Sequence, residues 1–154
     1  KRITYWPQLF LGITFNYGLL LAWVSVSNHI SLVSLAFYLG AIFWTLGYDT
    51  IYGFQDIKDD EIIGLKSTSI KFKSKPNALL ITCYSIFLIS LVFVGILIDM
   101  NNLFFLSLIL IFIHMFFLQL NKLEIKDPTN CLKIFKSNNS LGLIVFITLI
   151  IGKF

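Results

Sequence analysis

The chain has 154 residues, of which 57% are hydrophobic and only 13% are charged, and its mean hydropathy is +0.85. Soluble domains are closer to ~45–50% apolar and ~25% charged, so too few polar residues remain to cover a globule of this size. This composition excludes a soluble enzyme and a disordered chain. The net charge of +4 does not indicate a nucleic-acid-binding protein, because such proteins carry their basic residues on a hydrophilic face. The sequence predicts an integral membrane protein.

Long apolar stretches predict the membrane-spanning segments. About 20 apolar residues cross the ~30 Å hydrocarbon core as a helix, and the stretches lack the period-two alternation of barrel strands. The predicted fold class is therefore an all-α membrane protein, with residues 1–154 forming a single transmembrane domain. Five transmembrane helices are expected, at residues 7–26, 30–47, 76–98, 100–121 and 141–151, the last beginning nearer Asn138.

The connections between these stretches are of two kinds. The connections 25–29 and 99–102 are short and carry no Lys or Arg, whereas 49–75 and 121–140 are long, polar and rich in lysine. Alternating crossings place the two long loops on the same side of the membrane. The positive-inside rule predicts that this side is the cytoplasm, or its equivalent in an organelle.

The first long loop contains most of the acidic residues of the chain. Asp56, Asp59 and Asp60 are spaced i, i+3 and i+4, and Asp49 precedes Asp56 by seven residues. If the second span continues as a helix, all four carboxylates lie on one face. Like charges at these spacings destabilise a helix, so we expect a positively charged group or ion to offset the repulsion.

Several types of site are compatible with an acidic cluster. A solvated acidic helix end is one interpretation, but Asp is a poor helix former. The alternating ligands and central Gly of a calcium-binding loop are absent, and residues 64–68 do not satisfy the spacing of a phosphate-binding P-loop. Mg²⁺ remains, because it is commonly held by one or two carboxylates together with substrate phosphates. A lipid diphosphate suits a carboxylate cluster that lies beside lysines and below apolar helices.

Three segments carry a resemblance to a known family. Residues 49–69, which include Asp49, Asp56, Asp60 and Lys66-Ser67-Thr68-Ser69, resemble the second Asp-rich motif of the UbiA-type intramembrane prenyltransferases. They are most similar to the 4-hydroxybenzoate polyprenyltransferases of ubiquinone synthesis. Residues 1–12 resemble the segment that opens the middle helix of the family, and residues 135–142 resemble the motif before its last helix. One mild departure is Gly53, where the family usually has Ala.

The resemblance implies a function, a cofactor and a set of site residues. It implies a nine-helix bundle, of which these would be the last five helices, with the missing N-terminal helices as partner. The expected reaction is Mg²⁺-dependent transfer of a polyprenyl group from polyprenyl diphosphate to an aromatic acceptor, 4-hydroxybenzoate, in an inner membrane of a bacterium or a mitochondrion. Asp56 and Asp60 would be the main Mg²⁺ ligands, and Asp49 and Asp59 would be further ligands or would lie next to the ligands. Tyr52 would stabilise the carbocation that forms when the diphosphate leaves the prenyl chain. The residues expected to bind substrate are Lys1, Arg2, Lys66, Ser67 and Asn138.

Alternatives remain at this point. Naphthoate, homogentisate and haem are other acceptors used by the same chemistry. A transporter or channel fragment can also hold ions with intramembrane aspartates, although such sites lie near the midplane, whereas these aspartates lie at a helix end beside a basic loop. Cys83 and Cys131 are expected to be free thiols, with Cys131 in a polar loop, and His114 to be a neutral, hydrogen-bonded structural residue.

Overall fold

The computed structural model describes residues 2–153, which form helices and no strand within that range. Pro at the first position of three helices, and Ser or Asn side chains that cap others, mark where the helices begin. The helices in chain order are α1 Pro7–Phe15, α2 Tyr17–Ser27, α3 Leu32–Gly53, α4 Ile57–Ile62, α5 Thr68–Lys71, α6 Pro76–Leu97, α7 Asn102–Phe112, the π-helical η1 Ile113–Gln119, the 3₁₀ turn η2 Leu120–Lys122 and α8 Pro128–Ile151.

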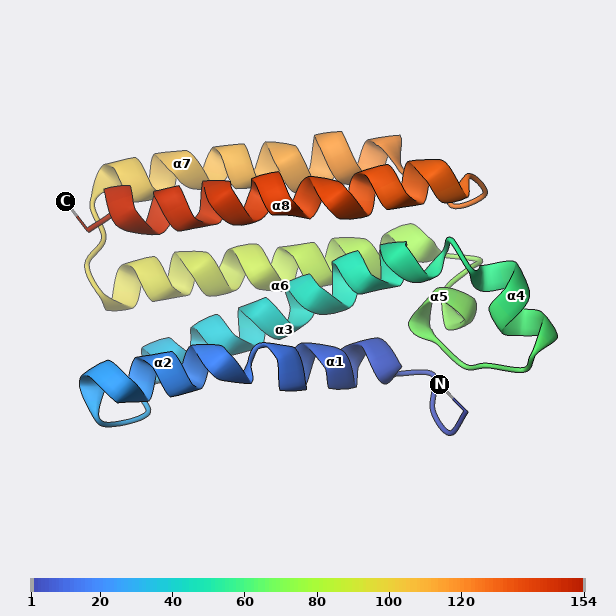
Figure 1. The fold of residues 1–154 in the computed structure, drawn as a ribbon. Helices are drawn as coiled ribbons and strands as arrows, with labels where there is room; N and C mark the ends of the chain where they lie inside the picture. Colours follow the sequence, from blue (N-terminus) through green and yellow to red (C-terminus); the bar gives the residue numbers. More distant parts are fainter. Residues whose placement is uncertain (1, 154) are drawn as a thin grey trace.

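Five helical stretches among the described residues are long and apolar enough to cross a membrane, as the sequence predicted. The α1–α2 pair forms one of them, and α7 continues through η1 and η2 to form another. The stretches run side by side with alternating direction, and the small helices α4 and α5 lie together at one end of the bundle (Figure 1). The all-α membrane fold class is confirmed.

The last span begins earlier than predicted from the sequence. Helix α8 starts at Pro128 instead of near Asn138, so much of the expected polar loop 121–140 is helical. The Asp127 carboxylate caps this helix by accepting from the backbone N–H of Thr129 at 2.9 Å. Cys131 is consequently buried on α8 and does not lie in a polar loop; it and Cys83 are free thiols, as predicted.

The acidic segment does not continue helix α3 as one unbroken helix. Helix α3 ends at Gly53, and a turn precedes α4, which begins at Ile57. The N–H of Phe54 bonds to the carbonyl of Ile51 at 3.2 Å, which is the tightened i→i−3 pattern of a helix end. Asp49 and Asp56 therefore do not share the face of one continuous helix.

The buried core lies among α3, α6, α7 and α8, whereas α1 and α2 pack chiefly against α3. Helices α3 and α6 come close where the Ser90 hydroxyl donates to the carbonyl of Ala36 at 2.7 Å, beside Gly40. Small residues allow such close approach between membrane helices. The outward apolar side chains of α1 and α2 suit a lipid environment, so their exposure has no destabilising consequence in a membrane.

Buried polar side chains join α6, η1 and α8. The Tyr84 hydroxyl donates to Oε1 of Gln119 at 2.6 Å, and Nε2 of Gln119 donates to the Ser137 hydroxyl at 3.0 Å. This satisfies polar groups that would be costly to leave unpaired in hydrocarbon. The buried Nδ1 of His114, in contrast, has no hydrogen-bond partner among residues 2–153, so the expectation of a hydrogen-bonded ring is wrong at this nitrogen.

Candidate functional site

Aromatic side chains line the face of α3 that looks toward α8. Trp44, Tyr48 and Tyr52 follow one another at four-residue spacing, which places them on one helix face. The ring centroids of Trp44 and Tyr48 are 6.0 Å apart. Phe135 of α8 packs against this face, with its ring centroid 5.8 Å from that of Tyr48 and 4.7 Å from that of Tyr52. The aromatic face therefore leads along α3 toward its acidic end.

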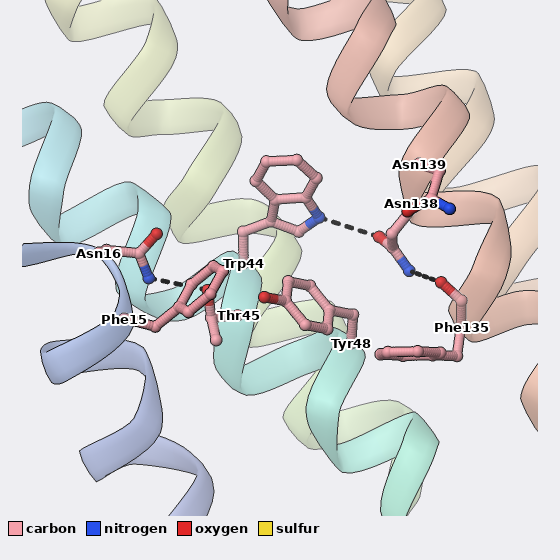
Figure 2. A pocket seen from close by; sticks show the side chains of 8 residues that line it. All are labelled: Phe15, Asn16, Trp44, Thr45, Tyr48, Phe135, Asn138 and Asn139. Carbon is pink, nitrogen blue, oxygen red and sulfur yellow. Dashed lines mark hydrogen bonds between the residues drawn. The ribbon is translucent and has the colours of Figure 1, made fainter. Parts of the chain in front are cut away.

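A pocket of about 240 Å³ lies next to this aromatic face. Its walls come from the junction of α1 and α2, from α3 and from α8, as Figure 2 shows. Both aromatic rings and amide or hydroxyl groups face it, so it can hold an aromatic molecule and orient its polar substituents. The lining residues are Phe15, Asn16, Trp44, Thr45, Tyr48, Phe135, Asn138 and Asn139.

Hydrogen bonds fix the walls of the pocket. The amide of Asn16 donates to the Thr45 hydroxyl at 2.8 Å and so ties α1 to α3. The indole N–H of Trp44 donates to Oδ1 of Asn138 at 3.0 Å, and Nδ2 of Asn138 donates to the carbonyl of Phe135 at 3.0 Å (Figure 2). Asn138 was predicted to bind substrate; in the structure it lines the pocket, is largely buried, and connects α3 to α8.

The predicted metal ligands lie at the acidic end of α3. Asp56 and Asp59 are exposed, Asp60 is buried, and Asp49 is partly buried on α3. The N–H of Asp60 bonds to the carbonyl of Asp56 at 2.8 Å, so these two residues are one helical turn apart. Within residues 2–153, no three acidic, His or Cys side chains gather as a metal site. One or two aspartates are nevertheless enough for Mg²⁺, which commonly takes its other ligands from substrate phosphates and water.

A buried polar network holds the Ser67-Thr68-Ser69 run against α1 and α3. The N–H of Thr68 donates to Oε1 of Gln8 at 3.0 Å, and the hydroxyls of Thr50 and Thr68 lie 2.7 Å apart. The Ser69 hydroxyl donates to the carbonyl of Thr50 at 2.8 Å. Ser67, predicted to bind substrate, is fully buried, and its hydroxyl caps α5 by accepting from the N–H of Ile70. The structure thus gives these hydroxyls an anchoring role.

The predicted cationic groups lie near the same end of the bundle. Lys66 is partly buried, and its ammonium lies 5.6 Å from the centre of the Tyr5 ring. Arg2 is exposed in the segment before α1, whose N-terminal end lies on the same side as α4 and α5 (Figure 1). Lys1 falls outside the described residues. Positive side chains are therefore available at the end of the bundle that carries the aspartates.

Some lining residues escaped the sequence analysis. Tyr48 lines the pocket, whereas Tyr52, the predicted aromatic residue, contacts Phe135 beside it. The four-residue spacing of the aromatic side chains on α3 is a signal that could have identified Tyr48. No comparable signal marks Asn16 or Thr45, because their place in the pocket depends on how α1 packs against α3.

Comparisons with known proteins agree with these motifs. The family described as "UbiA prenyltransferase family" matches residues 1–150. The mitochondrial 4-hydroxybenzoate polyprenyltransferase of Bos taurus is 41% identical over 99% of this chain, and that of Homo sapiens is 40% identical over 99%. The 4-hydroxybenzoate octaprenyltransferase of Francisella tularensis subsp. novicida is 38% identical over 98% of the chain. No solved structure matches the chain.

The chain spans only part of these curated relatives. It covers 41% of the bovine protein and 53% of the Francisella protein. The family match nevertheless extends over almost all of the chain, and it includes the aspartates at 49–60, Lys66 and the residues that line the pocket. The chain belongs to the UbiA prenyltransferase family.

Proposed function

We propose that this chain provides part of the active site of an enzyme that transfers a polyprenyl group from polyprenyl diphosphate to 4-hydroxybenzoate, with Mg²⁺ as cofactor. One observation carries the proposal: two aspartates one helical turn apart, Asp56 and Asp60, follow the end of a helix whose aromatic face leads to a pocket. The similarity to 4-hydroxybenzoate polyprenyltransferases supports the acceptor.

The diphosphate would bind at the acidic end of α3. Asp56 and Asp60 would hold Mg²⁺ with Asp49 and Asp59 nearby, and the metal would neutralise the negative charge of the leaving diphosphate. Lys66 is positioned by its buried neighbours Thr68 and Ser69, whose hydrogen bonds tie the run to α1 and α3. Its ammonium would pair with the diphosphate oxygens, while Arg2 and Lys1 would meet the diphosphate or the acceptor carboxylate.

The aromatic face of α3 would protect the reacting carbon. When the bond between the first prenyl carbon and the diphosphate oxygen breaks, the electron pair leaves with the diphosphate and the prenyl carbon becomes cationic. The rings of Tyr52, Tyr48 and Phe135 present π-electrons that stabilise such a cation, and apolar walls exclude water. The ring carbon ortho to the acceptor hydroxyl then forms the new bond and loses its proton.

The enzyme would also need the N-terminal helices. The pocket has amide and hydroxyl groups on its walls, and such groups are costly to expose to lipid at membrane depth. Since the chain spans about half or less of its relatives' length, we propose that further helices cover the pocket and supply a second carboxylate set. The lysine-rich loops would face the cytoplasm or the mitochondrial matrix.

The test is prenyl transfer in membranes of a host that lacks its own enzyme, carrying this chain together with the N-terminal helices. Asp56→Asn and Asp60→Asn should each lower turnover by about 100-fold or more, because Asn keeps the shape but removes the charge that holds the metal. Glu61→Gln is the matched control and should be close to wild type. EDTA should abolish the reaction and Mg²⁺ restore it. Near-normal transfer by Asp56→Asn at limiting Mg²⁺ would refute the assignment, and strong activity of the chain alone would refute the need for further helices.

A further inference from the structure

A second pocket lies at the polar end of the bundle, outside the candidate active site. It has a volume of about 370 Å³ and lies between the end of α3, the helix α4 and the turn before α8. None of the aspartates discussed above lines it. Its lining residues are Phe54, Gln55, Ile57, Lys58, Lys73, Ile125, Lys126 and Pro128.

Three lysines from three different segments converge on this pocket. Lys58 belongs to α4, Lys73 follows α5, and Lys126 precedes α8, and all three side chains are exposed. No acidic side chain lines the pocket. Glu61 forms an ion pair with Lys73 from outside the lining. The charged lining is thus cationic and suits an anion, and the ion pair with Glu61 partly neutralises one of its three lysines.

The remainder of the lining is apolar. Phe54 is only 1% exposed and forms a buried floor, and Ile57 and Ile125 are half-buried beside it. A small hydrated anion gains nothing from such a floor. A ligand that carries both a phosphate and an apolar part would contact the lysines and the floor together.

The depth of the pocket identifies the kind of ligand. Phe54 directly follows Gly53, where the spanning helix α3 ends, and Pro128 is the first residue of the spanning helix α8. The pocket therefore lies at the polar end of two spanning helices, beyond their apolar stretches, on the side where lipid headgroups and their phosphates are expected. Basic pockets between membrane helices at this level bind anionic headgroups.

We propose that Lys58, Lys73 and Lys126 form a binding site for the phosphate headgroup of an anionic phospholipid. The phosphate oxygens accept from the three ammonium groups, and the glycerol and upper acyl carbons lie on Phe54, Ile57 and Ile125. Binding separates Lys73 from Glu61. A lipid in this position links α4 to the turn before α8 and so holds the acidic segment against the bundle.

The test uses the full chain, reconstituted in phosphatidylcholine vesicles that contain a minor fraction of phosphatidylglycerol, and native mass spectrometry of the lipid that stays bound. Replacing Lys58, Lys73 and Lys126 together by Gln should weaken phosphatidylglycerol retention by at least about tenfold, since each lysine near an anionic headgroup contributes roughly fivefold. The matched control replaces three lysines outside the pocket by Gln and should stay within about twofold of wild type. These control positions are Lys75, Lys122 and Lys133, all of them exposed.

A second variant is expected to change phosphatidylglycerol retention in the opposite direction. Glu61→Gln frees Lys73 and should strengthen phosphatidylglycerol retention several-fold, a gain that misfolding does not produce. Equal losses in the two triple variants would overturn the proposal, because binding would then follow total charge. Absence of any gain with Glu61→Gln would also overturn it. Inorganic diphosphate should not displace the lipid at millimolar concentration; if it does, the pocket is a site for soluble anions and the lipid assignment fails.

Discussion

Gly53 is the position at which a small substitution tests the geometry of the acidic segment most directly. It is the last residue of α3 and is buried against the anchored run that follows Lys66. A Cβ added there would lie 2.3 Å from the hydroxyl oxygen of Ser69 and 3.3 Å from its Cβ. The Gly53→Ala variant therefore cannot form unless the Ser69 hydroxyl moves away.

The cost of that movement follows from what the hydroxyl does. The Ser69 hydroxyl donates to the carbonyl of Thr50 at 2.8 Å in a fully buried position. Losing such a bond costs about 0.5–1.5 kcal/mol, and leaving the buried group unpaired raises the cost to about 1–3 kcal/mol. Ala is a better helix former than Gly by up to about 1 kcal/mol. We therefore expect Gly53→Ala to lower the free energy of unfolding by about 1–2 kcal/mol.

A double-mutant cycle separates this clash from a general effect of substitution at Gly53. Ser69→Ala alone should lower the free energy of unfolding by about 1 kcal/mol, because it removes the same hydrogen bond. In the double variant the hydroxyl is gone, so its destabilisation should be smaller than the sum of the two single effects by about 1 kcal/mol or more. The measurement is the unfolding temperature of the purified chain in detergent. Strict additivity of the two substitutions would show that Gly53 and Ser69 do not meet as described.

Three further predictions concern topology and packing. A Cys placed at Asn28 should react with an impermeant reagent from the side opposite to a Cys placed at the exposed Ser74; reaction of both from one side contradicts the topology, and the two native thiols are buried. Asn138→Ala removes the acceptor of the Trp44 indole N–H and should lower the free energy of unfolding by about 1–3 kcal/mol. An unchanged unfolding temperature would argue against that hydrogen bond. Gly95→Ala places a Cβ 2.3 Å from a ring carbon of a fully buried phenylalanine on α7, and it should destabilise by about 1–3 kcal/mol. Gly18→Ala, with open space around the added carbon, is its control and should be neutral or stabilising.

The fold was largely predictable because the thickness of the membrane fixes the length of an apolar helix. Membrane thickness does not fix the start of α8, since the first turns of this helix extend beyond the apolar stretch and carry Asn and Lys. The local signal was present in Asp127-Pro128, a capping residue followed by Pro at the first helical position. Hydropathy locates the membrane-embedded part of a helix, whereas capping residues locate where it begins.

The candidate site was predictable only where its residues are close in sequence. The carboxylates of Asp56 and Asp60 and the aromatic spacing on α3 can be identified from a few consecutive turns. The bond between Trp44 and Asn138 joins residues that are 94 positions apart, and nothing in either segment specifies the other. The pocket between α3 and α8 depends on this packing, so the sequence alone could not assign its lining.

In the run Lys66-Ser67-Thr68-Ser69, Lys66 and Ser67 were predicted to bind substrate, and the structure shows how the hydroxyl residues are held. Hydroxyl side chains next to a lysine are as suitable for phosphate oxygens as for backbone groups, so residue type does not separate the two uses. In the structure the three hydroxyl residues are fully buried, and they contact Gln8, Thr50 and the backbone of α5. Only Lys66 is left partly exposed. Because its neighbours are held on α1 and α3 by short hydrogen bonds, the position of the lysine is set by the spanning helices and not by a free loop. In the proposed reaction, the hydroxyls would contribute through this rigidity, and the contact with the diphosphate would come from the ammonium of Lys66.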